Sequence, residues 1–231
     1  MPFQPTTLFL TFIWLALILI RFRRSSMVLI AGLLAVGLYT LFALVFGWVT
    51  PRQLGLGLPQ SWPATIGFAA AGLACILAYS PLADRLASRW FKKPPTLESF
   101  RIIQQSPVKL IAGILAAWLL GGLLEELIAR GIVLMSVKTL LAPSLGAPSA
   151  VGIAICIAAA GAGLFHRYQG PRAMLIIAQL SILFGILFVV SGYNLWAVIL
   201  CHGFYDTIAF IRFAAGKSKY SHLDADRSIK S

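Results

Sequence analysis

LLEELIARGIV, residues 123–133, places three charged side chains, Glu125, Glu126 and Arg130, inside one of the most apolar regions of the chain. The chain has only seven acidic residues in 231, so two adjacent carboxylates in this setting need a physical reason. A charged residue at the centre of a membrane helix costs about 2.5–3.5 kcal/mol on insertion scales. Such residues therefore face one another or a water-filled cavity, and they indicate a functional site.

The composition around this stretch is that of a membrane protein. Hydrophobic residues make up 59% of the chain and charged residues 11%, and the mean hydropathy is +0.88. A soluble domain is nearer half apolar and a quarter charged. Apolar runs of roughly 17 to 25 residues recur, the length that crosses a hydrocarbon core of about 30 Å. We therefore predict an all-α fold, a polytopic transmembrane helical bundle.

About seven spans are expected, separated by connections that contain proline or glycine. They lie near residues 7–21, 27–49, 62–80, 107–135, 148–166, 173–191 and 194–214. The apolar stretch over residues 107–141 would be about 52 Å long as an α-helix, which is too long for one straight span. A kink or break at Gly121-Gly122 is expected there, and a crossing by both halves would give eight spans.

The chain divides into three regions by composition. Residues 1–106 hold the amino-terminal spans and an amphipathic cytoplasmic loop, in which DRLASRWFKK, residues 84–93, is expected to form an interfacial helix. Residues 107–215 form the helical core that carries the intramembrane charges, and residues 216–231 are expected to be a disordered cytoplasmic tail. The remaining acids are assigned to polar loops or the tail: Asp84, Glu98, Asp224 and Asp226.

The net charge of +12 is explained by orientation in the bilayer. The basic residues flank the apolar runs and form no dense tract, so no nucleic-acid partner is expected. Sixteen of the 19 Lys and Arg residues fall in connections assigned to one side or in the tail, and only Arg52 and Lys138 to the other. We expect a multi-pass integral protein of a bacterial cytoplasmic membrane, with the carboxyl terminus in the cytoplasm and the amino terminus outside.

Spacing assigns roles to the charges at the start of the core. Glu126 and Arg130 stand at i and i+4 in the favourable order, which predicts an intrahelical ion pair. Glu125 points about 100° away from Glu126 on an α-helix and has no cation nearby in sequence. Glu125 is therefore the candidate general base, and its alternative role is that of a structural carboxylate.

The other intramembrane polar groups lie further along the chain. His202 and Asp206 repeat the i,i+4 spacing, so one helix face presents an imidazole and a carboxylate. His166 ends its span beside Arg167. Taken singly, these groups could be a satisfied core hydrogen bond and an interfacial histidine. Their joint occurrence on helices that can converge favours a shared site.

Three motifs in this order resemble those of the CPBP family of membrane proteins. This family comprises type II CAAX-processing endopeptidases and bacteriocin-processing or immunity proteins. EELIAR, residues 125–130, reads as EExxxR, GAGLFHRYQG supplies the histidine of the second motif, and HGFYD, residues 202–206, reads as HxxxD. The resemblance covers roughly residues 50–215.

The resemblance implies an intramembrane endopeptidase. Its substrate would be a membrane-associated or lipidated, CAAX-like protein or peptide within the lipid bilayer. Glu125 and His166 would activate the attacking water, and His202 and Asp206 would stabilise the oxyanion or position the substrate. The resemblance also implies that Glu126 and Arg130 hold the geometry of the site.

Two positions depart from the family pattern. Ala162 stands where an aromatic residue is usual four positions before the histidine, and Asp206 replaces the commoner asparagine. A carboxylate donates no hydrogen bond unless it is protonated, so His202 would serve the oxyanion alone or Asp206 would orient His202.

Metal dependence is open at this point. Glu125, His166 and His202 could ligate Zn²⁺, because carboxylate and imidazole both suit that ion. The chain has no HExxH motif, so we favour a metal-independent glutamic-type hydrolase with no cofactor. A non-catalytic immunity or scaffold protein is the main alternative. A proton-coupled transporter is less favoured, because it predicts inverted repeats and broken helices in both halves of the chain, whereas the first half contains no intramembrane charge.

Overall fold

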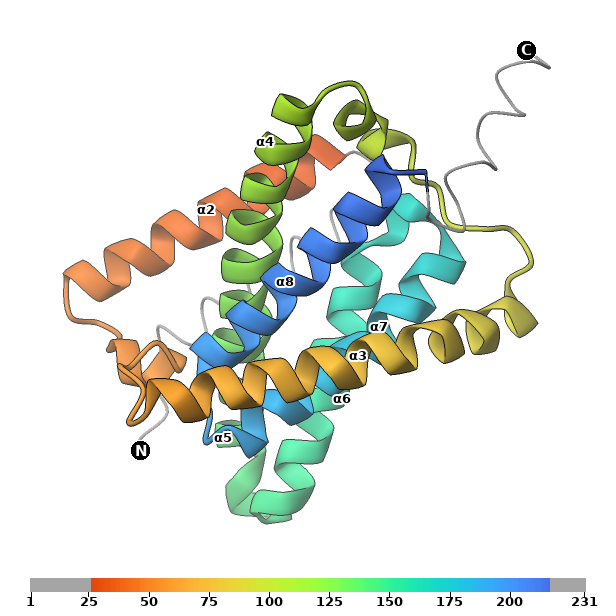
Figure 1. Cartoon of the computed structure of the whole chain (residues 1–231). Helices are drawn as coiled ribbons and strands as arrows, with labels where there is room; N and C mark the ends of the chain where they lie inside the picture. Colours follow the sequence, from red (N-terminus) through yellow and green to blue (C-terminus); the bar gives the residue numbers. More distant parts are fainter. Residues whose placement is uncertain (1–25, 217–231) are drawn as a thin grey trace.

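A computed structural model describes residues 26–216, and within this range the chain is helical and contains no strand (Figure 1). The predicted all-α class is thereby confirmed. The longer helices are α2 (Ser26–Val45), α3 (Trp62–Trp90), α4 (Pro107–Ala117), η4 (Trp118–Glu125), η5 (Leu127–Leu134), α5 (Met135–Leu145), α6 (Ala147–Phe165), α7 (Pro171–Val190) and α8 (Leu195–Ala214). The short 3-10 helices are η2 (Pro51–Leu54), η3 (Glu98–Gln104) and η6 (Arg167–Gln169).

Over residues 26–216, five helices are long and apolar enough to cross a membrane. They are Trp62–Trp90, Pro107–Leu145, Ala147–Phe165, Pro171–Val190 and Leu195–Ala214. Each span predicted between residues 62 and 214 falls on one of these helices, and α2 adds a shorter apolar segment, Ile30–Val45. The span predicted at 7–21 and the tail after Gly216 lie outside the described residues, so the total of about seven stays a prediction.

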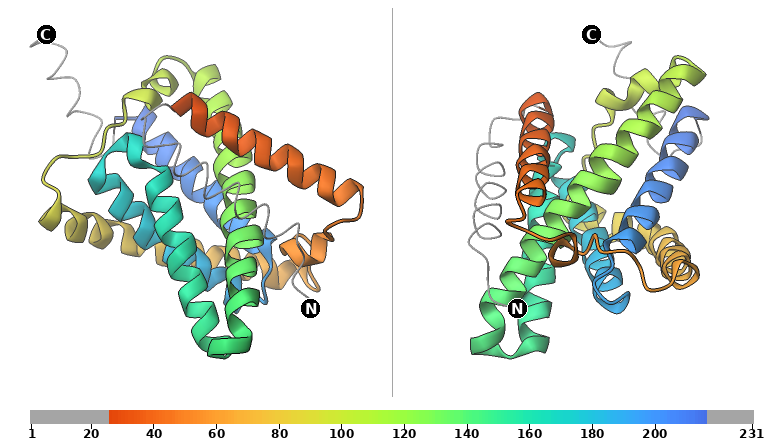
Figure 2. Two further views of the ribbon diagram at one scale, coloured as in Figure 1. Left: turned by 180° about the vertical axis from the view of Figure 1, so that it is seen from behind. Right: turned by 90° about the vertical axis from the view of Figure 1, so that its left-hand side faces the viewer.

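The stretch from Pro107 to Leu145 is one continuous helix of 39 residues (Figure 2). No break occurs at Gly121-Gly122, because the helix there passes from α to π geometry, and the alternative of a kink stays a prediction. Both glycines are buried, and a Cβ atom on Gly122 would lie 3.5 Å from the carbonyl oxygen of Ile199 in α8. The glycines therefore allow close approach of α8 to this helix.

Helix α3 also differs from the prediction. It continues without interruption through Pro81 to Trp90, so residues 84–90 do not form a separate interfacial helix. Asp84 lies in this helix and is buried, not placed in a polar loop. Arg172, at the start of α7, donates from Nε and Nη2 to Oδ1 of Asp84 at 2.9 and 2.6 Å. This ion pair compensates both buried charges and joins α3 to α7.

The middle of the long helix lies at the centre of the bundle. Helix α8 packs against α4 and η4, α6 packs against α7 and η5, and α3 crosses α7 and α8 (Figure 1). Every residue of η5 is buried. The largest side chains of the surrounding core include Ile128, Ile132, Leu134, Phe188 and Leu195. The charges of residues 125–130 are therefore enclosed by packed apolar helices.

Candidate active site

Glu125 and His166 meet between two helices. Glu125 ends η4 and His166 follows the last residue of α6, which places Glu125 Oε1 3.8 Å from His166 Nε2. Their side chains are 23% and 16% exposed, so neither is fully buried. His166 Nδ1 lies 2.9 Å from the carbonyl oxygen of Ala162. Because a carbonyl only accepts, Nδ1 carries the proton, and Nε2 of the neutral ring presents a lone pair to Glu125.

The backbone and the neighbouring aromatic rings hold His166 in this orientation. At Ala162 the carbonyl contacts the imidazole, where the family pattern has an aromatic side chain. Tyr168 stacks on the imidazole with ring centroids 6.0 Å apart, and Phe165 approaches it edge-on at 6.5 Å. The aromatic contacts of His166 thus come from residues after Ala162.

Glu126 forms a second, fully buried group. Arg130 Nη1 lies 3.0 Å from Glu126 Oε2 and donates to Oε1 at 3.1 Å, so the expected i,i+4 ion pair forms. The pair is not closed on itself, since His202 Nδ1 lies 2.6 Å from Glu126 Oε1. Glu126 therefore connects the arginine of the long helix to the histidine of α8.

His202 also faces Asp206 along α8. His202 Nε2 lies 3.5 Å from Asp206 Oδ2. With Nδ1–H donating to Glu126, the imidazole presents a second proton to Asp206 only when it is cationic. Glu126, His202 and Asp206 thus form one connected polar group, drawn from the long helix and α8.

Helix α7 adds two residues that the motifs do not indicate. Arg130 Nη2 donates to Ser181 Oγ at 2.7 Å and to the carbonyl oxygen of Ser181 at 2.8 Å. The Phe184 ring stacks on the His202 imidazole at 4.8 Å and 24°, and the Arg130 guanidinium lies 5.4 Å from the centre of the same ring. The available sequence signal was Ser181, a hydroxyl in an uncharged apolar run and one helical turn before Phe184.

Glycines bring η4 and α8 together around Asp206. A Cβ atom on Gly121 would lie 2.9 Å from Asp206 Oδ2 and 3.4 Å from His202 Nε2. A Cβ atom on Gly203 would lie 2.5 Å from the ring of Trp118. Because Gly121 and Gly203 have no side chains, η4 and α8 can approach each other closely and leave room for the Asp206 carboxylate.

The three residues named as possible zinc ligands, Glu125, His166 and His202, have different neighbours. No group of three or more His, Cys, Asp or Glu side chains that could hold a metal ion occurs between residues 26 and 216. Glu125 and His166 are adjacent, but Nδ1 of His202 is engaged by Glu126.

Comparison with known proteins agrees with the motifs. Residues 107–208 match the family model described as Type II CAAX prenyl endopeptidase Rce1-like. The matched segment begins at the first residue of α4, ends within α8 and contains all the predicted site residues. Neither a curated protein nor a solved structure matches the chain. The match confirms the predicted resemblance: residues 107–208 of this integral membrane protein are similar to the Rce1-like type II CAAX prenyl endopeptidase family.

Proposed function

We propose that the protein is an intramembrane endopeptidase that hydrolyses a peptide bond of a membrane-associated or lipidated, CAAX-like protein or peptide. The family match supports a membrane hydrolase of the CAAX protease kind. The observation that carries the proposed mechanism is the separation of 3.8 Å between Glu125 Oε1 and His166 Nε2.

That separation suits a shared water. It exceeds the length of a direct hydrogen bond, and the carboxylate and the neutral Nε2 both accept. A water between them would donate one hydrogen to each. In the proposed reaction its oxygen attacks the peptide carbonyl carbon while Glu125 takes one proton. The protonated Glu125 then gives that proton to the leaving amine as the C–N bond breaks.

The group formed by Glu126, His202 and Asp206 would stabilise the negative charge that develops on the carbonyl oxygen. A cationic His202 would donate from Nε2 to the oxyanion, the kind of interaction that stabilises a tetrahedral intermediate. Asp206 lies beside that nitrogen and favours the cation before substrate binds. Glu126 fixes the ring through Nδ1. This assignment gives Asp206 an orienting role, since a carboxylate cannot itself donate to the oxyanion.

Reconstitution in liposomes tests the proposal. The wild type and Glu125→Gln, with Glu98→Gln as the control for an exposed acid, are given a library of membrane-anchored peptides with and without a lipid group. The Glu125→Gln variant is expected to lose about 10²- to 10⁴-fold in cleavage rate, and Glu98→Gln to retain the wild-type rate. In H₂¹⁸O the new carboxyl terminus should gain one ¹⁸O atom.

Two results would count against this function. Equal cleavage by the wild type and Glu125→Gln would remove Glu125 from the chemistry. Binding of peptides by both without any cleavage would favour a non-catalytic immunity or scaffold role for the cluster.

A further inference from the structure

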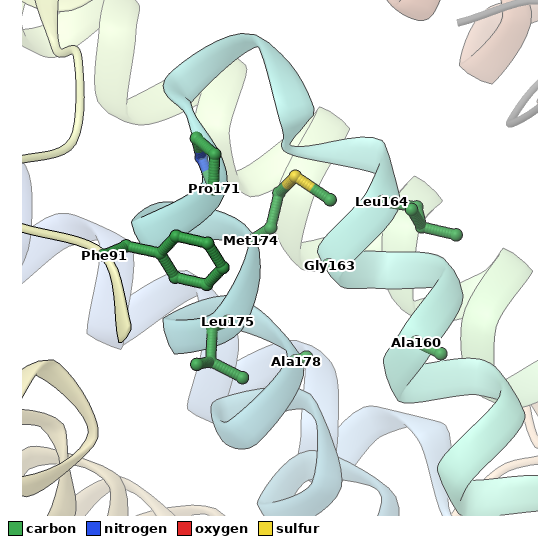
Figure 3. A pocket seen from close by; sticks show the side chains of 8 residues that line it. All are labelled: Phe91, Ala160, Gly163, Leu164, Pro171, Met174, Leu175 and Ala178. Carbon is green, nitrogen blue, oxygen red and sulfur yellow. The ribbon is translucent and has the colours of Figure 1, made fainter. Parts of the chain in front are cut away.

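An apolar groove runs along the seam between α6 and α7, with a volume of about 260 Å³ (Figure 3). The residues that line it include Ala160, Gly163 and Leu164 of α6, Met174 and Ala178 of α7, and Phe91 beside the first turn of α7. None of these carries a charge or a strong hydrogen-bonding side chain. The groove therefore suits a hydrocarbon chain better than a peptide backbone, whose polar groups would be left unpaired.

Small residues let α6 and α7 approach each other closely at the floor of the groove. A Cβ atom on Gly163 would lie 2.7 Å from the carbonyl oxygen of Met174 and 3.0 Å from Cβ of Ala178, so the two helices touch there. Ala160 continues the strip of small residues one turn earlier on α6. The volume is below the roughly 300–1,000 Å³ of pockets for drug-sized ligands, so the groove holds a segment of one chain.

Basic side chains lie at the Phe91 end of the groove. Lys92 and Lys93 follow Phe91 directly and both are exposed, as is Arg89 in the last turn of α3. Trp90 is 80% exposed. Figures 1 and 2 show this end of α3 extending beyond α6 and α7. Exposed tryptophan with lysine and arginine at the end of a membrane helix is typical of the lipid headgroup region.

The segment that carries the lysines is fixed to the turn between α6 and α7. The backbone N–H of Thr96 donates to the carbonyl oxygen of Gln169 at 2.9 Å. The cations and the groove are therefore parts of one surface, apolar along the helices and positive at one end.

We propose that this surface binds an anionic phospholipid, with part of an acyl chain in the α6–α7 groove and the phosphate beside Lys92 and Lys93. Charge complementarity selects the headgroup, because each lysine near a negatively charged lipid surface favours binding. The site is distinct from the Glu125–His166 cluster, although Leu164 of the groove lies two residues before His166. The proposal is independent of peptide hydrolysis, since lipid binding is measured without substrate.

Native mass spectrometry of the full chain released from detergent tests the headgroup. The protein is offered phosphatidylglycerol and phosphatidylcholine with identical acyl chains, and the wild type should retain phosphatidylglycerol preferentially. The double variant Lys92→Gln/Lys93→Gln should bind phosphatidylglycerol about 30-fold more weakly and phosphatidylcholine as before. Arg52→Gln, an exposed cation in η2, is the control and should leave both affinities unchanged.

A second pair of variants tests the groove. Ala160→Phe fills the groove and should reduce retention of both lipids about tenfold. A loss of this size corresponds to the contacts of about two methylene groups of the acyl chain. Gly152→Phe is placed on the same helix where a new side chain meets open space, and it should change neither. Excess inorganic phosphate should not displace the lipid, because the chain contributes to binding.

Equal retention of the two lipids by the wild type would overturn the proposal, as would unchanged phosphatidylglycerol binding in Lys92→Gln/Lys93→Gln. Displacement by inorganic phosphate would reduce the site to an anion site without a chain. A peptide retained in place of lipid would assign the groove to a protein partner.

Discussion

Glu125 and Glu126 are adjacent in the chain but lie in different surroundings. Glu126 has no exposed side-chain surface and contacts both Arg130 and His202, whereas Glu125 is 23% exposed and faces His166. Removal of the charge at Glu126 leaves the buried Arg130 uncompensated, while removal at Glu125 leaves no such cation. We therefore expect Glu126 to contribute mainly to stability and Glu125 mainly to peptide cleavage.

Matched amide variants test this difference. Glu126→Gln is expected to lower the free energy of unfolding by about 3–5 kcal/mol, the cost of breaking a buried ion pair from one side. Glu125→Gln should keep the wild-type unfolding temperature and lose cleavage. Thermal unfolding in detergent and the liposome cleavage assay measure the two effects. Equal loss of stability in both variants would contradict the separate roles.

Phe184 should act through His202. Its ring stacks on the imidazole at 4.8 Å, and such aromatic contacts contribute about 0.5–1.5 kcal/mol beyond burial. Phe184→Leu is therefore expected to lower kcat by roughly 2- to 12-fold with little change in KM. Ile182→Leu, a half-exposed position on the same helix, is the control and should behave as the wild type. A change confined to KM would argue against positioning of the imidazole.

At the scale of the helical element, the two adjacent glycines of η4 have different neighbours. A Cβ atom on Gly121 would press on Asp206 Oδ2 at 2.9 Å, but on Gly122 its nearest contact would be at 3.5 Å. Alanine at either position gains roughly 1 kcal/mol of helix propensity. Gly121→Ala should therefore fold but displace Asp206 and lose activity, while Gly122→Ala should keep activity. Unfolding temperatures and cleavage rates of the pair provide the measurement, and equal activity would contradict the proposed part of Asp206.

The sequence predicted the elements better than their internal geometry. Residue spacing alone placed Glu126 with Arg130 and His202 with Asp206, because i,i+4 contacts are local. The π geometry of Trp118–Glu125 was not predictable, since the apolar run fits several helical periods. Continuation of α3 through Pro81 was missed because proline usually interrupts a helix.

Contacts between distant segments were also beyond the sequence. Asp84 and Arg172 are 88 positions apart, and both were assigned to loop regions by the polarity of their neighbours. Ser181 and Phe184 lie in the part of α7 after Arg172, which carries no charge, so nothing local connects them to Arg130. Their roles depend on which face α7 turns toward the long helix. That choice follows from packing of the whole bundle.

In the molecule as a whole, contacts between segments that are distant in sequence place the ends of the helices in two groups. Gln104 donates to the carbonyl oxygen of Phe213 at 3.0 Å, which joins the connection after α3 to the end of α8. At the other group, Leu195 N–H donates to the carbonyl oxygen of Gly55 at 2.9 Å, and Lys138 Nζ lies 3.6 Å from the centre of the Tyr193 ring. Among the described residues, the first group contains Lys92, Lys93 and Arg101, and the second contains Arg52 and Lys138.

This arrangement gives a test of orientation. The positive-inside rule places the basic group in the cytoplasm, together with the end of α6 that carries His166. In a variant without native cysteines, Lys93→Cys should react with a membrane-impermeant maleimide only after the cells are opened. Leu58→Cys, at a position 87% exposed in the opposite group, should react in intact cells. The reverse pattern would place the Glu125–His166 pair nearer the outer face, and a cytoplasmic peptide would then not reach it. Labelling as expected would support approach of the substrate to Glu125 and His166 from the cytoplasmic side.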